Sequence, residues 1–431
     1  MSAQHRFLPS LSPEKIHAIQ TQGLNWTLRH AYAGNARYRE RLAQAGYDPA
    51  DTVSLDDLSR IPVTTVDELR RGYPLPLLSV PERDVVRIHA SSGTTGKRKI
   101  LAYTQNDIDT WKDMFARCYE LAGLTTADRV QIAVGYGLWT AGAGFQLGCE
   151  RFGAMSVPIG PGNMEIHLHL LEDLQTTCLC STASMALLLA EEVAKHNLRK
   201  KIALKKAIFG AETHTPKMRA RFVDWLGLED SFDISGMTEL YGPGAGLECA
   251  AHTGIHYWAD LYILEVLDPE TLQPVAPGEV GEIVVTTLRK EASPLIRYRT
   301  RDLTRLIPGD CPCGLCLPRH DRILGRSDDM FIFRGVNVYP GQIAAVVEHF
   351  PELGSEFQIR LTRKDGRDQM LVKIERKLGV SAEFDQNLSE AVSVELRKHL
   401  LARGWVEIVA PGDLPRSFGK TKRLIDDRNE E

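Results

Sequence analysis

The sequence contains no apolar run long enough to cross a membrane. Its most apolar stretch, residues 185–190, is far shorter than the roughly 20 residues that a transmembrane helix needs. Residues 1–10 contain neither a long apolar segment nor a small-residue cleavage pattern, which argues against a secretory signal peptide. These absences predict a cytoplasmic protein that does not bind membranes.

The chain also lacks an excess of positive charge. Its 52 Lys and Arg residues against 56 Asp and Glu residues leave a formal net charge of −4. This balance gives no general attraction to nucleic acid, so a phosphate group would have to be bound at a local site. Cysteine is scarce, with 8 residues in 431. In a reducing cytoplasm, thiols that cluster indicate a metal site before a disulfide.

Neither an internal repeat nor a low-complexity segment is present, and 431 residues are too many for one ordinary core. The middle of the chain alternates short apolar runs with stretches of helical periodicity, which predicts a layered α/β domain with a mainly parallel sheet. The predicted strands there are 130–134, 155–157, 177–179 and 207–209. After Gly242 the pattern has the period of antiparallel strands, and a compact unit begins near Gly325.

The predicted fold is therefore α/β with two domains. A large N-terminal domain, residues 1–325, combines layered α/β subdomains with an antiparallel β region. A small α+β C-terminal domain, residues 326–431, follows after a short link. A short link favours a defined hinge, so we expect the small domain to be mobile.

A loop rich in glycine and hydroxyl side chains is the strongest local signal. It reads Ser91, Ser92, Gly93, Thr94, Thr95, Gly96 and Lys97. Glycine lets the backbone turn its N–H groups toward an anion, hydroxyls donate to phosphate oxygens, and lysine adds a positive charge. The glycine spacing is not that of a Walker A loop. Composition alone would favour a flexible surface loop, and the order of the residues changes that balance.

The order of residues in this loop resembles the phosphate loop of the adenylate-forming superfamily of acyl-CoA synthetases. Further segments resemble the phenylacetate–CoA ligase branch of that superfamily, over nearly the whole chain. They are 87–97, 136–139, 142–144, 210–212, 293–302, 325–330, 334–338 and 415–420. The resemblance implies that ATP adenylates a carboxylic acid and that coenzyme A then takes up the acyl group. Members of this branch often form homodimers, and we expect the same here.

The resemblance also implies which residues bind ATP and Mg²⁺. Asp302 would accept hydrogen bonds from the ribose hydroxyls, Glu239 would hold Mg²⁺ beside the phosphates, and Thr238 would contact the α-phosphate. Lys420 would stabilise the negative charge that develops during adenylation. The remaining ATP residues are the loop 91–97, Ala211, Glu212, Ser235, Gly236, Met237 and Arg326.

Two positions follow from the resemblance and a third departs from it. Asp328 matches the hinge residue about which the C-terminal domain is thought to rotate between the two steps. Gly335 would face the pantetheine tunnel in the second step. Ser235 stands where the family usually has a tyrosine that stacks on adenine, and Tyr241 is one residue that could compensate.

An apolar slot for an aromatic acid is expected from the resemblance. Its predicted residues are Tyr136, Gly137, Trp139, Gly142 and Gly144. Aromatic side chains beside glycines suit a flat ring, although the same composition is common in ordinary packing. An arylacetic or benzoic-type acid fits this slot. His89 could face ATP or the acid, and a core histidine explains it equally well.

Three cysteines and a histidine predict a metal site. Cys249, His256, Cys311 and Cys313 form a Cys₃His set that suits tetrahedral Zn²⁺. Their spacing is not that of a common zinc finger, but several members of the resembled branch carry similar residues. Cys316 or His252 could replace one of the four. With four protein ligands the ion would be structural.

The prediction is an aryl- or arylacetate–CoA ligase that depends on ATP and Mg²⁺. Two alternatives stay open. The acyl group could pass to a carrier protein or another acceptor, or the chain could bind nucleotide without catalysis. Lys97, Glu239, Asp302 and Lys420 argue against an inactive protein, because a site without chemistry does not need all four charges.

Overall fold

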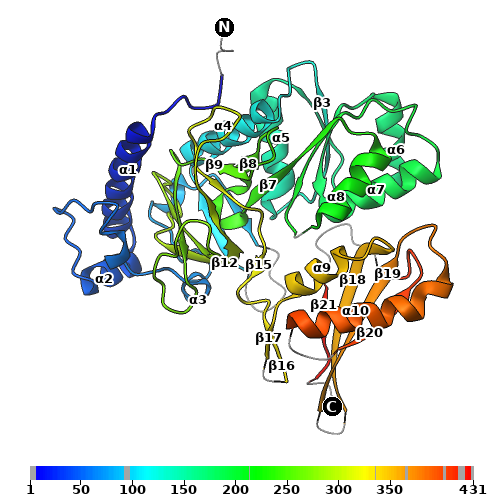
Figure 1. Cartoon of the computed structure of the whole chain (residues 1–431). Coiled ribbons are helices and arrows are strands. Elements are labelled where there is room, and N and C mark those ends of the chain that lie inside the picture. The colour runs from blue at the N-terminus through cyan, green and yellow to red at the C-terminus, as the bar shows by residue number, and fades with distance from the viewer. Residues whose placement is uncertain are drawn as a thin grey trace. The chain divides into compact units, whose positions relative to one another are not determined.

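The computed structural model of the chain describes residues 6–91, 98–212, 214–334, 336–364, 367–400, 404–415 and 423–428. The chain forms two compact units (Figure 1). The larger unit comprises Met1–Ser181, Ile202–Ala211 and Asp230–Ile323, and the smaller unit comprises Thr182–Lys201, Glu212–Glu229 and Leu324–Glu431. Among the described residues, no helix is both long enough and apolar enough to cross a membrane.

Two helices form the apolar centre of the larger unit. Helix α4 (Gln105–Leu121) begins at a capping box between Thr104 and Asp107 and turns its buried aromatic side chains to the core. Helix α5 (Thr140–Phe152) packs on it through glycines, because a Cβ atom at Gly148 would lie 2.2 Å from Cβ of Phe115. The other described α-helices of this unit are α1 (Pro13–Gly34), α2 (Ala36–Gln44), α3 (Val66–Arg71) and α6 (Met164–Asp173).

The central sheet of the larger unit has 9 strands, in the order β13-β14-β9-β8-β7-β6-β5-β3-β4. They are β3 (Arg129–Ala133), β4 (Met155–Pro158), β5 (Cys178–Thr182), β6 (Lys206–Gly210), β7 (Asp230–Met237), β8 (Gly242–Glu248), β9 (Ile255–Tyr257), β13 (Leu306–Ile307) and β14 (Arg319–His320). Strand β3 pairs in parallel with β4 and β5, and β6 pairs in parallel with β7. From β7 through β8, β9 and β14 to β13 the pairing is antiparallel. The sheet thus changes direction at β7, the strand that carries Ser235.

Two further β structures complete the larger unit. Strands β10 (Tyr262–Leu267), β11 (Gly281–Thr287) and β12 (Tyr298–Thr304) pair antiparallel. Asp302 lies on β12. Strands β1 (Arg87–Ala90) and β2 (Ile100–Tyr103) form a hairpin. In the sequence the predicted phosphate loop, residues 91–97, lies between these two strands.

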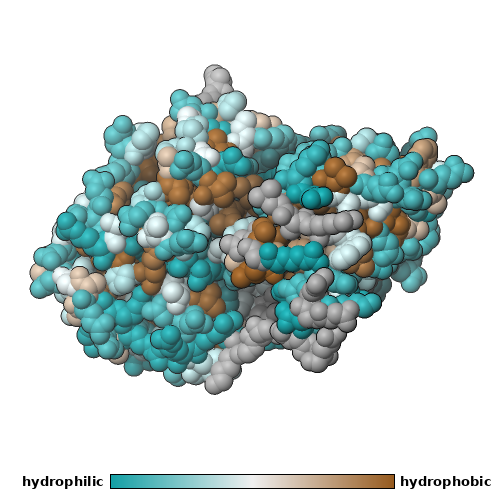
Figure 2. Space-filling view, turned by 60° about the horizontal axis from the view of Figure 1, so that its bottom comes forward, coloured by the Kyte–Doolittle hydropathy of each residue, from teal (hydrophilic) through white to brown (hydrophobic). Residues whose placement is uncertain are grey.

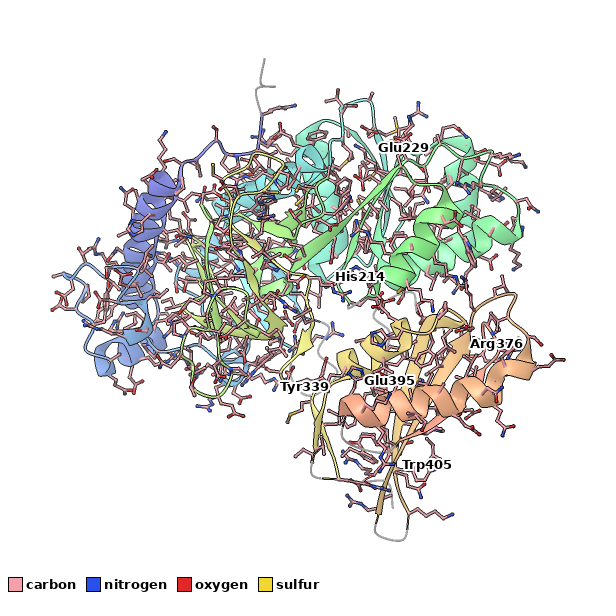
Figure 3. All side chains as sticks on the ribbon, viewed as in Figure 1. His214, Glu229, Tyr339, Arg376, Glu395 and Trp405 are labelled. Carbon is pink, nitrogen blue, oxygen red and sulfur yellow. The ribbon has the colours of Figure 1, made fainter. Side chains whose placement is uncertain are left out.

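The smaller unit has its own core. Its sheet has the order β20-β19-β18-β21, and the core includes Phe333, Ile343, Ile359, Val372 and Leu396. Figure 3 marks Glu395 on helix α10 and Trp405 at the start of β20. The elements are α7 (Ala183–Lys195), α8 (Pro216–Leu226), β15 (Gly325–Arg326), β16 (Phe331–Phe333), β17 (Val336–Val338), α9 (Pro340–Glu348), β18 (Leu353–Lys364), β19 (Arg367–Arg376), α10 (Asp385–Leu400), β20 (Trp405–Val409) and β21 (Leu424–Asp426).

The predicted α/β fold, with layered α/β structure, an antiparallel β region and a separate C-terminal unit, is confirmed. Helices α7 and α8 lie within the predicted N-terminal domain in the sequence, but both cluster with the C-terminal segment in the structure. The domain boundary at 325/326 stays a prediction. Hydrophilic residues cover much of the face shown in Figure 2, with hydrophobic patches between them, which is ordinary for a folded protein.

Candidate functional site

The residues on either side of the predicted phosphate loop are paired with each other. Ala90 lies opposite Ile100, and the backbone N–H of Ser91 donates to the Lys99 carbonyl at 3.1 Å. The two ends of the loop are therefore held side by side. Several predicted site residues lie outside the described residues, namely Ser92, Gly93, Thr94, Thr95, Gly96, Lys97, Gly335 and Lys420.

Glu239 lies in a short 3-10 turn that directly follows β7, and it is buried. Its carboxylate pairs with the ammonium of Lys99 and accepts a hydrogen bond from the Tyr298 hydroxyl at 3.0 Å. The Tyr103 hydroxyl donates to the carbonyl of Thr238 at 3.0 Å, which fixes the start of the turn. Burial alone raises the pKa of Glu239, but Lys99 and the hydrogen bonds outweigh burial and lower the pKa overall. The predicted Mg²⁺ ligand is therefore a buried carboxylate that stays ionised at neutral pH.

A second lysine supports this turn from inside the protein. Lys290 is fully buried, and its ammonium donates to the Glu239 carbonyl at 3.0 Å. The same ammonium lies 4.8 Å from the ring centres of both Tyr103 and Tyr241. Burial lowers the pKa of Lys290 to about 8. The Tyr241 ring therefore contacts the ammonium of Lys290 in the protein interior.

Residues predicted to bind the nucleoside share one pocket in the larger unit. Ser235, Gly236 and Met237 line it from β7, and Asp302 lines it from β12. The other lining residues are Leu240, Ala245, Tyr257, Tyr262, Leu264, Ile283, Val285, His320 and Ile323. The pocket is therefore largely apolar, with one carboxylate. Tyr241, the residue considered as a substitute for the missing aromatic ring, is not among its lining residues.

The other predicted ATP and hinge residues have local partners. Ala211 adopts a φ of 70° directly after β6, a left-handed conformation that a tight turn requires. Glu212 accepts a hydrogen bond from the backbone N–H of Ser184. In the smaller unit, Arg326 and Asp328 form an ion pair at 2.8 Å. Their roles in ATP binding and domain rotation stay predictions.

The predicted acid slot surrounds the start of α5. A Cβ atom on Gly142 would lie 2.7 Å from the Tyr136 ring, and one on Gly144 would lie 2.5 Å from the Phe115 ring. Rings of the protein therefore occupy the space beside both glycines. Gly137 has a φ of 78°, and Trp139 is the N-cap of α5. That these residues bind an acid stays a prediction.

Polar atoms near the predicted slot are buried and have no hydrogen-bond partner among the described residues. They include the Tyr136 hydroxyl, the Thr140 hydroxyl, the Trp111 Nε1 atom and the His89 Nε2 atom. The His89 ring stands edge-on to Trp111, with ring centres 5.1 Å apart. Burial lowers the pKa of His89 to about 4, so the ring is neutral at pH 7.

The four predicted zinc ligands converge. The sulfur atoms of Cys249, Cys311 and Cys313 and a ring nitrogen of His256 all lie within 4.8 Å of one another. Cys249 Sγ is 3.5 Å from Cys311 Sγ, and Cys313 Sγ is 3.3 Å from His256 Nε2. The other ring nitrogen of His256 donates to the Leu317 carbonyl at 2.9 Å, which leaves Nε2 facing the sulfurs. Cys316 and His252, the considered substitutes, are not part of this cluster.

Sequence reasoning missed several residues of the site. Lys99, Lys290, Tyr257 and His320 received no role, and Tyr298 entered only as a member of the segment 293–302. Most of them are recognised only through partners that are distant in the sequence, as with Lys99 and Glu239, which are 140 positions apart. For Tyr257 a signal existed, because it directly follows the predicted zinc ligand His256.

Comparison with known proteins identifies the family. The family model of AMP-binding enzymes matches residues 38–288, and the model of the AMP-binding enzyme C-terminal domain matches residues 335–428. A phenylacetate-coenzyme A ligase of Escherichia coli (strain K12) is 41% identical over 98% of this chain and 97% of its own length.

Solved structures agree over nearly the same span. A 2-hydroxyisobutyryl-CoA ligase in the postadenylation state, with 2-HIB-AMP bound, is 28% identical, with a TM-score of 0.89 over 99% of this chain and 92% of that one. The same ligase in the thioesterification state, with 2-HIB-AMP and CoA, is 28% identical, with a TM-score of 0.70 over 98% and 91%. The chain belongs to the adenylate-forming AMP-binding enzymes, in their phenylacetate–CoA ligase branch.

Proposed function

We propose that this chain is an ATP- and Mg²⁺-dependent ligase that joins an aromatic carboxylic acid, of the aryl or arylacetic type, to coenzyme A. The observation that carries the proposal is that Ser235, Met237 and Asp302 line one pocket. The buried carboxylate of Glu239 lies two residues after Met237 in the sequence. The similarity to a phenylacetate-coenzyme A ligase, and to a CoA ligase solved with an acyl-adenylate and CoA, supports the same reaction.

The reaction has two balanced steps. The carboxylate of the acid attacks the α-phosphorus of ATP, and pyrophosphate leaves with the bonding electron pair. The sulfur of coenzyme A then attacks the acyl carbon, AMP leaves, and the thiol proton is released. Negative charge grows on the pyrophosphate in the first step, so cations fixed nearby lower the barrier. We assign this role to Lys420 and Lys97, and we assign the ribose hydroxyls to Asp302.

The residues around Glu239 fit a magnesium ion. A carboxylate is the hard oxygen ligand that Mg²⁺ prefers, and Glu239 is held ionised by its surroundings. When bound, Mg²⁺ supplies positive charge that neutralises the phosphates of ATP. Lys99 pairs with the same carboxylate, so we infer that its ammonium moves toward the phosphates when Mg²⁺–ATP binds.

The Cys₃His cluster fits a zinc ion. A tetrahedron with Zn–S bonds of about 2.3 Å has edges of about 3.8 Å, close to the 3.5 Å between Cys249 Sγ and Cys311 Sγ. His256 is oriented by its bond to Leu317, as metal-ligating histidines usually are. Four protein ligands leave no position for a substrate, so we propose a structural zinc ion.

The second step is proposed to follow a rotation of the C-terminal domain about Asp328, with Gly335 on the side of coenzyme A. In the smaller unit Asp328 forms an ion pair with Arg326, two positions before it in the chain. A homodimer is also expected from the resemblance, and sedimentation of the purified protein tests it.

The test is pyrophosphate release with Mg²⁺–ATP across a panel of phenylacetic, benzoic and aliphatic acids, with and without coenzyme A. We expect release with one group of aromatic acids, followed by an acyl-CoA thioester when coenzyme A is present. Release that stops at acyl-adenylate would assign the acyl group to a carrier protein or another acceptor. Binding of ATP without release with any acid would contradict the proposal.

A further inference from the structure

The pocket that contains Ser235 is bordered by one row of residues across three strands. Ser235 on β7 pairs with Gly246 on β8, and Gly246 pairs with Tyr257 on β9. Directly opposed residues of antiparallel strands project from the same face of a sheet. Gly246 has no side chain, so the space between the Ser235 hydroxyl and the Tyr257 ring is left to other groups.

His320 enters that space from the next strand. Its Nε2 atom lies 3.3 Å from the Ser235 hydroxyl, and its ring centre lies 6.4 Å from that of Tyr257. Its other nitrogen, Nδ1, lies 2.6 Å from the carbonyl of Asp321. A carbonyl only accepts, so Nδ1 carries the hydrogen and Nε2 is left with a lone pair. Burial lowers the pKa of His320 to about 4, which keeps the ring neutral at pH 7.

The remaining pocket walls suit a nucleoside. Leu264, Ile283 and Val285 are apolar, and Asp302 adds the carboxylate that can accept from ribose hydroxyls. Nucleobases bind to proteins by stacking on aromatic rings and by hydrogen bonds along their edges. Tyr257 and His320 are the aromatic residues of this pocket that sit beside Ser235, and His320 also offers an acceptor.

We propose that Tyr257 and His320 form the nucleobase wall of the ATP site, and that His320 Nε2 accepts a hydrogen bond from the amino group of adenine. The proposal rests on the proposed function, because it assumes that ATP occupies this pocket. On binding, the Ser235 hydroxyl gives up its bond to Nε2 in favour of the base. Inosine and guanine carry an oxo group at the same ring position. This oxygen and His320 Nε2 are both acceptors and cannot form a hydrogen bond, so these bases bind more weakly.

The experiment measures the dissociation constants of Mg²⁺–ATP and Mg²⁺–ITP by calorimetry on the full chain. We expect the wild type to prefer ATP by about tenfold or more, the range for one buried hydrogen bond lost. His320→Met keeps an apolar side chain of similar length but has no comparable acceptor, so ATP binding should weaken while ITP binding stays the same. His320→Gln supplies an amide oxygen and should restore much of the preference for ATP.

Controls separate base recognition from damage to the pocket. Leu264→Met changes an apolar wall of the same pocket and should weaken both nucleotides equally, if at all. Tyr257→Leu removes a stacking surface and should weaken both without altering their ratio. An unchanged ATP-to-ITP ratio in His320→Met overturns the role of His320. Failure of the wild type to bind Mg²⁺–ATP overturns the proposed function instead.

Discussion

Replacing Lys290 by methionine should remove a pH dependence from the stability of the larger unit. Methionine fills similar apolar space, but it loses the charge, the bond to the Glu239 carbonyl and both ring contacts. Burial lowers the pKa of Lys290 from 10.5 to about 8. Each pKa unit corresponds to about 1.4 kcal/mol, so the whole shift is worth about 3 kcal/mol.

The sign follows from where the proton is bound. Between about pH 8 and pH 10.5 the unfolded chain keeps the proton on Lys290 while the folded chain has lost it. The unfolded state then binds more protons, so the stability of the wild type rises with pH in this window. Below about pH 8 the cost of burying the charge is fully present. Methionine does not titrate, so the variant lacks this contribution.

Urea unfolding of both proteins at about pH 7 and about pH 9.5 measures the effect. Over the part of that interval above pH 8, the wild type should gain about 2 kcal/mol relative to Lys290→Met. Subtracting the free energy of unfolding of the variant from that of the wild type removes the contributions of thiols and tyrosines, which titrate in both proteins. Lys15→Met, at an exposed position, is the control and should show no such change. An equal wild-type-minus-variant difference at both pH values would refute the assignment of a buried, easily neutralised lysine.

Three further substitutions test the proposed chemistry. Glu239→Gln should lower pyrophosphate release by about 10²–10³-fold because the metal loses its anionic ligand; a rate within about threefold of wild type contradicts that role. Elemental analysis should find zinc in the wild type and in Cys316→Ser but not in Cys313→Ser; equal zinc contents in the wild type and Cys313→Ser would remove Cys313 from the ligand set. Lys420→Ala should abolish adenylation but spare thioester formation from a synthetic acyl-adenylate, and equal loss of both steps would exclude the assigned role.

The sequence was sufficient to predict those parts of the candidate site whose role only a few residue types can perform. Four cysteine and histidine ligands could be selected because few side chains bind zinc, and they converge although 62 positions separate Cys249 from Cys311. Ser235, Met237 and Asp302 likewise share a pocket, as the resemblance led us to expect.

The rest depended on contacts that have no local signature. Lys290 follows an arginine and precedes a glutamate, a pattern typical of solvent-exposed turns, yet it is fully buried between two tyrosine rings. The partner of Lys99 could not be inferred, because any of several acidic residues would satisfy a lysine. Gly142 and Gly144 were expected to leave room for a substrate ring, and the structure fills the adjacent space with Tyr136 and Phe115.

The cysteine cluster and the pocket that contains Ser235 and Asp302 lie on opposite faces of strands β9 and β14. Tyr257 directly follows His256, and His320 directly follows Arg319, which donates to Thr253 beside Cys311. Successive residues of a strand project from opposite faces, so a shift on one face moves the other. An oxidant or chelator that attacks only the thiols should therefore lower the affinity for a nucleotide that it never touches.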